Sequence, residues 1–330
     1  MEFTPNRGDC LSVMGLARDL NIFYGKNDYL EIFDDPIEKF DFKFDNLSID
    51  SCTSISFLEL EVKDNKPKYK DYLETYFNNT EQKKNNFFAD ITNYLSYEIG
   101  QPSHCYDSEK ITGEIVFEKR VCNEEFETLL GEKIKLEGIN SVFSMDDKAI
   151  CLAGVIGGNE TACTPSTKKA IIEFASFNPE DILGKSIKYN IHSDAAYKFE
   201  RGVDNEMQDF ALRRFIEIVK EHTEIISLRC FKNQYINQSK KFIDLDINKI
   251  NKILGTSLTY EECINFLSKL GFRLNGRIEV PSFRRDIETH NDIAEEIARL
   301  IGYDNIQKKQ ISINVEKKNS SELDLLSIKE

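Results

Sequence analysis

The sequence predicts an α+β protein in which a strand-rich middle region is followed by a compact, helix-rich module. Residues 113–176 contain segments such as KIKLEGI whose side chains alternate between apolar and polar, which is typical of strands. Helix-capping residues and apolar side chains at helical spacing follow this region. After about residue 235 the pattern changes to short helices that follow one another closely, with one short strand among them.

Composition limits the class of protein. At ~150 residues per domain, the 330 residues correspond to about two domains. The chain is 40% hydrophobic and 30% charged, which suits a folded protein with a core. Its 43 Lys and Arg against 57 Asp and Glu give a net charge of −14, which excludes a general nucleic-acid coat or a polybasic membrane binder but permits a local basic patch for nucleic acid.

Localisation is predicted from what the sequence contains along its length. No apolar run approaches the ~20 residues that span a bilayer, and the opening MEFTPNRGDC has no apolar signal-peptide core. The eight Cys are scattered without a CxxC pair, so we expect free buried thiols in a reducing compartment. A soluble cytoplasmic protein is therefore expected.

Helix-capping and helix-breaking residues, together with the spacing of apolar residues, predict the elements of the first 234 residues. The polar stretch 62–86 predicts a short helix between loops, and the apolar element that begins at Phe87 should end at Gly100-Gln101-Pro102. Ala149–Gly158 predicts a buried strand that enters a tight glycine turn. Asn178 before Pro179 predicts a helix start, and Asp204 is expected to cap a helix over 205–222.

The C-terminal module is defined by caps. Asp246 should open a short helix that Gly255 closes, and Thr259 with Glu262 forms a capping-box pattern before a second helix. A strand at 278–280 and a third helix over 292–301 complete the module, and the polar residues after 307 are predicted to be a connector.

Glu173, in the segment AIIEFAS, is the first candidate for chemistry. In a strand it shares one face with Ile171 and Ala175, while Ile172 and Phe174 share the other face. A carboxylate inside an apolar strand is costly unless a partner stabilises it. From position alone, a binding role and a structural role held by backbone or Arg partners are about equally supported.

Two further segments invite functional interpretations that their spacing rejects. Gly154-Val155-Ile156-Gly157-Gly158 is not a GxGxxG motif and opens no helix, so a plain hairpin is the commoner explanation. His192-Ser193-Asp194-Ala195 places Ser, His and Asp next to one another, which does not allow the geometry of a catalytic triad. His104 is a lone imidazole, and such residues are more often structural than catalytic.

A group of carboxylates marks the third helix of the C-terminal module. Asp292, Glu295 and Glu296 are spaced i, i+3 and i+4, so they share one helical face, and Asp286 precedes them. Oxygen ligands of this kind suit Mg²⁺. Spacing alone slightly favours the alternative, a solvated acidic face that Arg284, Arg285 or Arg299 neutralises.

Several segments, in order, resemble one protein family. They are TPNRGDCLSVMGLARDL, DITNYLSYEIGQPSHCYD, LAGVIGGNE, IIEFASFNP, HSDAAYKFERGVD and VPSFRRDI with DIAEEIARLIGYDNI. They resemble the β subunit of bacterial phenylalanyl-tRNA synthetase over residues 4–306. The resemblance implies a mixed β-sheet B3/B4 editing module over 54–225 and a B5 module over 235–310, preceded by a partial first domain (1–53) and followed by a connector (311–330).

The resemblance also implies partners and a reaction. In the family the α subunit carries out ATP-dependent aminoacylation of tRNA(Phe) within an (αβ)₂ tetramer, and the β subunit's editing module hydrolyses Tyr mischarged onto tRNA(Phe). The family's OB-type tRNA-binding, catalytic-like and anticodon-binding domains have no counterpart in this sequence, so a fragment or incomplete reading frame is expected. The sequence contains no ATP site that we identify, so ATP is expected to be used by the complex.

The site residues are carried over by motif. Glu173 falls on the position that recognises the hydroxyl of Tyr, and His104 and Asn93 fall on positions near the ester. Gly157 falls on the turn that leaves room for substrate, and Ser193 and Ala195 fall on the segment that gates the pocket. By the same matching, the family's Mg²⁺ ligands, at a site shared with the α subunit, are Asp286, Asp292, Glu295 and Glu296.

Some positions depart from the family pattern and weaken the expectation of full editing activity. Ser193 replaces the usual Thr, Ala196 stands where Ser is common, residues 81–86 replace a basic, Pro-containing approach, and Cys52 lacks the usual Pro-Arg that follows it. Two alternatives therefore stay open. One is a free-standing deacylase that edits in trans, and the other is a scaffold that has kept the fold and lost editing.

Overall fold

The computed structural model of the protein describes residues 3–25, 30–235 and 240–307. The chain forms two compact units, Met1–Asp244 with Ser268–Glu288 and Leu245–Leu267 with Thr289–Glu330. This division cuts through the predicted module 235–310: its short strands belong to the first unit and most of its helical residues to the second. The predicted connector 311–330 lies outside the described residues.

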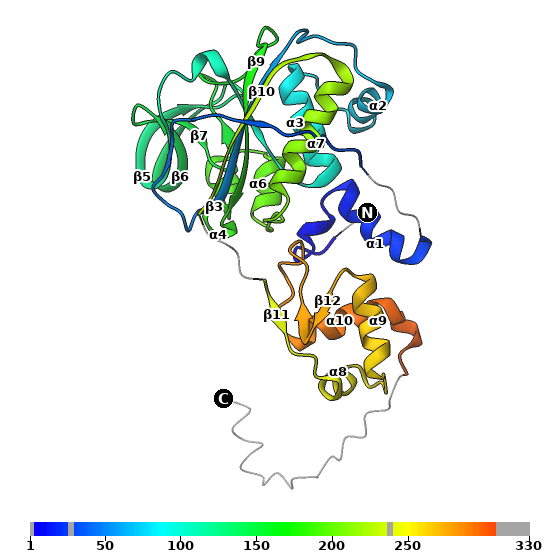
Figure 1. Ribbon diagram of the computed structural model, residues 1–330. Helices are drawn as coiled ribbons and strands as arrows, with labels where there is room; N and C mark the ends of the chain where they lie inside the picture. Colours follow the sequence, from blue (N-terminus) through cyan, green and yellow to red (C-terminus); the bar gives the residue numbers. More distant parts are fainter. Residues whose placement is uncertain (1–2, 26–29, 236–239, 308–330) are drawn as a thin grey trace, which may run out of the picture. The chain divides into compact units, whose positions relative to one another are not determined.

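The first unit contains two five-stranded sheets, both mixed. One sheet has the order β1 (Glu38–Lys39), β10 (Ile225–Gln234), β3 (Cys52–Val62), β9 (Lys169–Phe177) and β4 (His104–Asp107), and only its β1–β10 pair is parallel (Figure 1). The other has the order β2 (Phe44–Asn46), β5 (Ile115–Glu127), β6 (Lys133–Met145), β7 (Lys148–Leu152) and β8 (Ile156–Gly157), with β2 parallel to β5.

A smaller sheet and several helices complete the first unit. The small sheet has the order β11 (Phe242–Ile243), β13 (Arg277–Glu279) and β12 (Arg273–Asn275). The helical segments are η1 (Gly8–Cys10), α1 (Val13–Tyr24), α2 (Asp71–Thr80), α3 (Phe87–Ile99), η2 (Ser108–Lys110), α4 (Pro179–Ile182), α5 (Lys185–Tyr189), α6 (Asp194–Phe199) and α7 (Gln208–His222). The predicted α+β class is confirmed.

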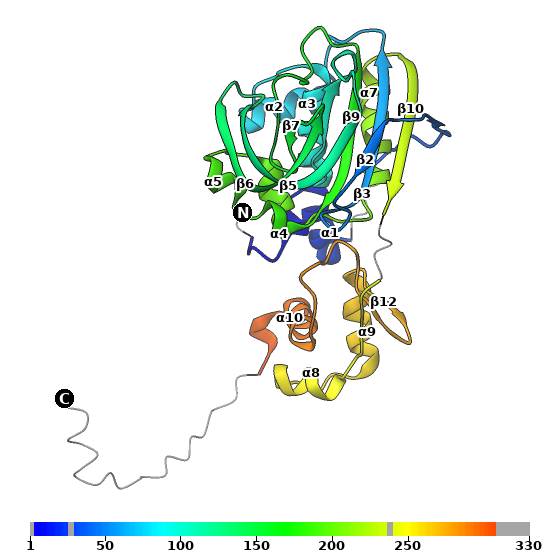
Figure 2. The same ribbon diagram turned by 90° about the vertical axis from the view of Figure 1, so that its left-hand side faces the viewer.

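The central strands separate two hydrophobic cores, and β9 shows how. Ile171 and Ala175 belong to the core between the two large sheets, whereas Ile172 and Phe174 belong to the core beneath α3 and α7. This is the alternation predicted from the segment AIIEFAS, because successive side chains of a strand point to opposite faces. Figure 2 shows α7 on one face of the first sheet and the strands of the second sheet on the opposite face of the first sheet.

The helix ends test the predicted caps. Asn178 caps α4 by accepting a hydrogen bond from the Glu180 N–H, and α3 ends at Gly100, whose φ of 83° is left-handed. The cap predicted at Asp204 is wrong, since α7 begins at Gln208 without a side-chain cap. The Asp204 carboxylate instead accepts a hydrogen bond from the Glu206 N–H, and this local turn replaces the first turn of the expected helix.

The second unit consists of short helices. They are α8 (Ile247–Leu254), most of α9 (Tyr260–Lys269), α10 (His290–Ile301) and η3 (Tyr303–Asn305), and α8 packs against α10. Asp246 caps α8 as predicted, and Thr259 and Glu262 bond each other's backbone N–H in the predicted capping box. Helix α10 begins two residues earlier than predicted, with Thr289 as its N-cap.

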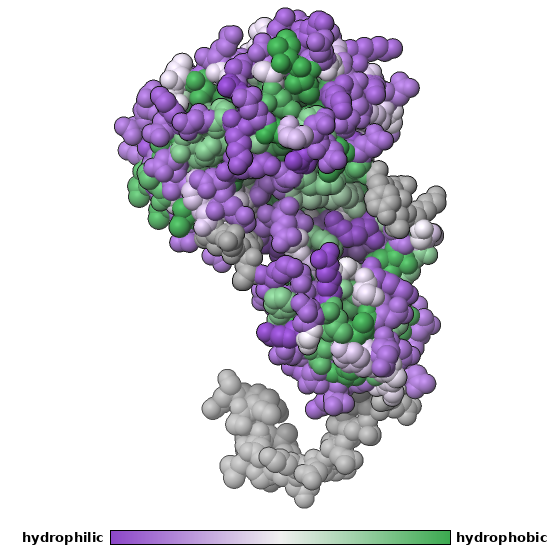
Figure 3. Space-filling model, in the orientation of Figure 1, coloured by the Kyte–Doolittle hydropathy of each residue, from purple (hydrophilic) through white to green (hydrophobic). Residues whose placement is uncertain are grey.

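The surface and the thiols agree with the composition. All eight Cys are buried and free, as predicted. The face of the molecule in Figure 3 is mainly hydrophilic, with hydrophobic patches on the side where β5 and β6 lie in Figure 1. Among the described helices, none is both long and apolar enough to cross a membrane.

Candidate functional site

Glu173 lies at the centre of β9 and points into the apolar layer between the two large sheets. Its residue is 5% exposed, and its neighbours along the same face are Ile171 and Ala175. Burial raises the pKa of Glu173 to about 8, although a hydrogen bond from Tyr106 works in the opposite direction. That bond joins the Tyr106 hydroxyl to Glu173 Oε2 at 2.7 Å. The carboxyl group is therefore largely protonated at neutral pH.

His104 lies directly beside Glu173 because the two residues are register partners in the β4–β9 pair. Burial lowers the pKa of His104 to about 4, so its imidazole is neutral at neutral pH. Within the described residues, its Nε2 atom is buried and has no hydrogen-bond partner. A buried polar atom without a hydrogen bond destabilises the fold, and such atoms in native proteins often have a functional role.

Gly157 packs onto the His104 ring. A Cβ atom on Gly157 would lie 2.1 Å from His104 Cε1 and 2.5 Å from Nε2, far inside van der Waals contact. The glycine turn predicted over 154–158 is an antiparallel β7–β8 hairpin, and its left-handed residue is Gly154. The plain-hairpin interpretation is therefore correct for the backbone, while Gly157 additionally makes room for an imidazole.

Ser193 and Ala195 lie at the start of α6, close to this hairpin. Ser193 caps α6 by accepting a hydrogen bond from the Ala196 N–H, and its Oγ donates to the Val155 carbonyl at 2.5 Å. Ala195 packs against the core between the sheets. Because the Ser193 hydroxyl serves a cap and a backbone carbonyl, the rejection of a catalytic triad here agrees with the geometry.

Asn93 lies elsewhere on the first unit. It is exposed on α3, a helix whose buried side packs against the face of the sheet opposite Glu173. The structure thus brings Glu173, His104 and Gly157 together and ties Ser193 to the same hairpin, while the predicted place of Asn93 near an ester stays a prediction.

The predicted Mg²⁺ ligands are divided between the two units. In the first unit, Asp286 accepts hydrogen bonds from Arg284 at 2.8 and 2.9 Å and from Asn6 at 3.1 Å. The carboxylate of Asp286 is therefore already compensated by a guanidinium, as the alternative of a neutralised acidic face expects.

In the second unit, the three carboxylates of α10 have different surroundings. Asp292 completes a capping box with Thr289, Glu296 is buried and accepts from Arg299 at 2.7 Å, and Glu295 is exposed. Their oxygen ligands fit the preference of Mg²⁺. Arg299 competes with a cation for Glu296, so the metal role of this set stays a prediction.

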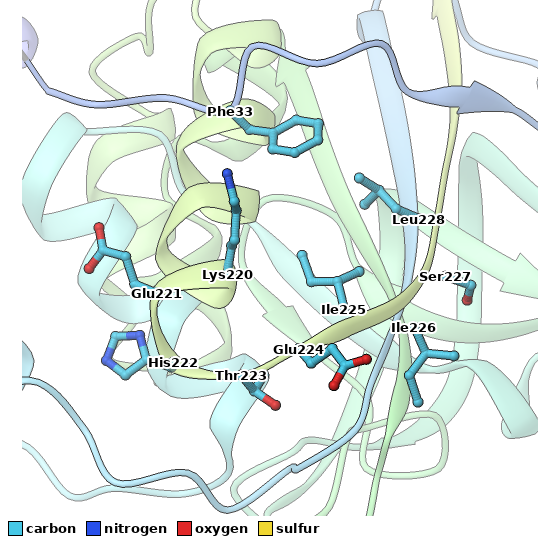
Figure 4. A pocket seen from close by; sticks show the side chains of 10 residues that line it. All are labelled: Phe33, Lys220, Glu221, His222, Thr223, Glu224, Ile225, Ile226, Ser227 and Leu228. Atoms are coloured by element: carbon cyan, nitrogen blue, oxygen red, sulfur yellow. The ribbon is translucent and has the colours of Figure 1, made fainter.

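One cleft of the first unit lies away from these groups. It has a volume of about 620 Å³ and is lined by the end of α7, the start of β10 and Phe33 (Figure 4). Its polar groups are engaged: His222 Nδ1 contacts the Ile218 carbonyl, Glu221 accepts from Tyr72, and Glu224 pairs with Lys63. A reaction at Glu173 therefore stays a prediction, which the unpaired Nε2 atom of His104 and the buried carboxyl group of Glu173 support.

Two parts of the chain match known domain families. Residues 58–224 match the model of the B3/4 domain, and residues 243–303 match that of the tRNA synthetase B5 domain. The matches define a B3/4-domain protein that also carries a B5 domain. The chain belongs to the phenylalanine–tRNA ligase β-subunit family, over the part that contains these two domains.

Individual relatives span the same part of the family. The chain is 32% identical to the phenylalanine–tRNA ligase β subunit of Fusobacterium nucleatum and 33% identical to that of Francisella tularensis, over 96% and 98% of its own length. It covers 41% and 42% of those proteins. A crystal structure of an N-terminal fragment of the Pyrococcus horikoshii phenylalanyl-tRNA synthetase β subunit is similar with a TM-score of 0.43 and 15% identity, covering 91% of this chain and 85% of that one.

Tyr106 is the contact that the sequence analysis missed. It is fully buried, and its ring meets the His104 ring edge-on with 4.5 Å between centroids. The signal was present in the segment HCYD, because residues two apart in a strand share a face. Once His104 is placed opposite Glu173, Tyr106 must point into the same layer.

Proposed function

We propose that this chain supplies the editing part of a phenylalanine–tRNA ligase β subunit and hydrolyses Tyr mischarged onto tRNA(Phe). The observation that supports this most is the pairing of a buried carboxyl group, Glu173, with a neutral imidazole, His104, inside an apolar layer. An apolar surface holds an aromatic ring, and a carboxyl group in its wall hydrogen-bonds a phenol. A side chain without the hydroxyl cannot make this hydrogen bond, which is how such a site would disfavour Phe.

The proposed chemistry is positioning with an activated water. A carboxyl group with a pKa of about 8 bonds the phenol either as donor or through its carbonyl oxygen. His104, with a pKa of about 4, is a weak base, so it orients the ester or the attacking water through its unpaired Nε2 rather than storing a proton. Water attacks the ester carbonyl, the ribose oxygen leaves with a proton, and no protein nucleophile takes part.

The chain is also proposed to act within a larger complex. By its family it would support ATP-dependent aminoacylation of tRNA(Phe) by an α subunit in an (αβ)₂ tetramer, in the cytoplasm. Asp286, Asp292, Glu295 and Glu296 would contribute oxygen ligands to a Mg²⁺ site shared with that subunit, where the ion would neutralise their charge and fix the interface. Each part of this assignment rests on motif matching.

The test is deacylation of tRNA(Phe) charged with Tyr or with Phe. Wild-type chain should release Tyr faster than Phe, and Glu173→Ala should lose the Tyr reaction. The matched control is Glu59→Gln, because Glu59 is a buried carboxylate on the same face of the same sheet whose charge Lys169 and Arg229 pair at 2.8 and 2.6 Å. No release above buffer, with α subunit and the remaining β-subunit domains added, would refute editing and leave the scaffold alternative.

A further inference from the structure

The chain already places a phenol of its own on the carboxyl group that the proposed function assigns to a substrate phenol. Tyr106 lies on β4 two residues after His104, and its side chain is fully buried. Its hydroxyl donates to Glu173 Oε2 at 2.7 Å. Because the ring also packs edge-on against His104, at 88° between planes, rotation of Tyr106 away from Glu173 would break both contacts.

This contact affects how strongly an editing site would reject a phenylalanyl ester. Discrimination by a hydroxyl is large when the analogue without it leaves a buried polar group unpaired. Here Glu173 keeps one hydrogen bond, from Tyr106, when a side chain without a hydroxyl lies beside it. The penalty against a phenylalanyl ester is thereby reduced, and one of the two carboxyl oxygens is no longer fully free for the phenol of a tyrosyl ester.

We propose that Tyr106 is a specificity-determining residue, whose hydroxyl lowers the preference of the Glu173 site for tyrosyl over phenylalanyl esters. This inference rests on the proposed editing function and deepens it. Tyr106 acts through Glu173 and does not take part in the hydrolysis itself. It also explains a fully buried tyrosine in a position where phenylalanine would fill nearly the same volume and need no hydrogen-bond partner.

The experiment compares the ratio of kcat/KM for Tyr-tRNA(Phe) to that for Phe-tRNA(Phe) in wild type and Tyr106→Phe. Removal of one hydrogen bond to Glu173 should raise this ratio roughly three- to tenfold. The matched control is Tyr69→Phe, since Tyr69 also donates to a buried carboxylate, Asp90, at 2.7 Å but lies on the far side of the sheet. Its ratio should equal that of wild type.

A double variant separates a direct effect from general loosening. If Tyr106 acts through Glu173, then Tyr106→Phe should leave the residual ratio unchanged in a Glu173→Ala background, where position 173 no longer offers a hydrogen-bond acceptor. If Tyr106→Phe does not fold, as judged by thermal unfolding, Tyr106→Met removes the same hydroxyl and keeps apolar bulk. An unchanged or lower ratio in the folded single variant overturns the inference while wild-type hydrolysis still upholds the proposed function. Absence of hydrolysis by wild type overturns both.

Discussion

Replacement of Glu173 by Gln should make the stability of the chain less sensitive to pH. In the folded chain the carboxyl group stays protonated up to its pKa of about 8, while in the unfolded chain it ionises near the ordinary value of 4.5. Between these values the unfolded state binds fewer protons, so the free energy of unfolding falls as pH rises. The substituted glutamine would be neutral in both states and would not contribute to this fall, yet its amide oxygen could still accept from Tyr106.

The size of the effect follows from the pKa shift. For a group that moves from 4.5 to about 8, proton linkage between pH 5 and pH 8 amounts to about 3.5 kcal/mol in the free energy of unfolding. The Glu173→Gln variant should therefore gain up to that much relative to wild type over this range. Urea unfolding at several pH values, followed by circular dichroism, measures the difference directly, and any pH dependence of other groups cancels between the two proteins.

The control is Glu59→Gln on the same sheet. Burial alone would raise the pKa of Glu59, but hydrogen bonds from Lys169 and Arg229 leave it lowered. The contribution of ionised Glu59 to the free energy of unfolding is present above its unfolded-state pKa and is lost only in more acid solution. The difference in this free energy between Glu59→Gln and wild type should therefore stay constant from pH 5 to pH 8. If the Glu173→Gln difference is equally constant, Glu173 ionises normally and its proposed environment is incorrect.

Three further predictions concern the hairpin, the gate and the metal ligands. Gly157→Ala should cost about 1–3 kcal/mol of stability and suppress hydrolysis, because the added Cβ would lie 2.1 Å from His104 Cε1; normal melting of this variant would contradict the packing. Ser193→Ala should lower the free energy of unfolding by about 1 kcal/mol, because it removes the α6 cap and the hydrogen bond to Val155. Ser193→Thr keeps the hydroxyl and should keep both contacts, so equal thermal stability of the two variants would exclude this role. Arg299→Gln should strengthen Mg²⁺ binding a fewfold because it removes a guanidinium that pairs with Glu296, as measured by isothermal titration calorimetry; unchanged heats would favour the neutralised acidic face.

Local rules predicted the parts of the structure that local forces decide. Asp246 and the Thr259–Glu262 pair sit where a few residues satisfy the first N–H groups of a helix, and the alternation around Glu173 follows from strand geometry alone. The cap predicted at Asp204 is wrong because this carboxylate accepts a hydrogen bond from the Glu206 N–H in a turn, an equally local contact that residue type alone does not distinguish from a helix cap.

Contacts between distant strands were not predictable in the same way. That His104 lies opposite Glu173 depends on the pairing of residues almost seventy positions apart, and the clash that only glycine avoids at Gly157 depends on a third strand. Asp292 shows a further limit: family matching predicts it as a Mg²⁺ ligand, and its part in the capping box of α10 was not predicted from the sequence. Family motifs located the candidate residues, and the fold explains why Tyr106 must join them.

The arrangement of the site depends on the register in which the four-residue strand β4 pairs with β9. His104 and Tyr106 both face the carboxyl group because they are two positions apart in a strand whose intervening residue, Cys105, packs into the helix-side core. A slip of β4 by one residue would turn both side chains to the opposite face while preserving the backbone pairing with β9. Insertions or deletions in the loop at 100–103 should therefore be compatible with a working site only when they let β4 keep this register. The length of this loop is then constrained by the site, although none of its residues is proposed to take part in the reaction.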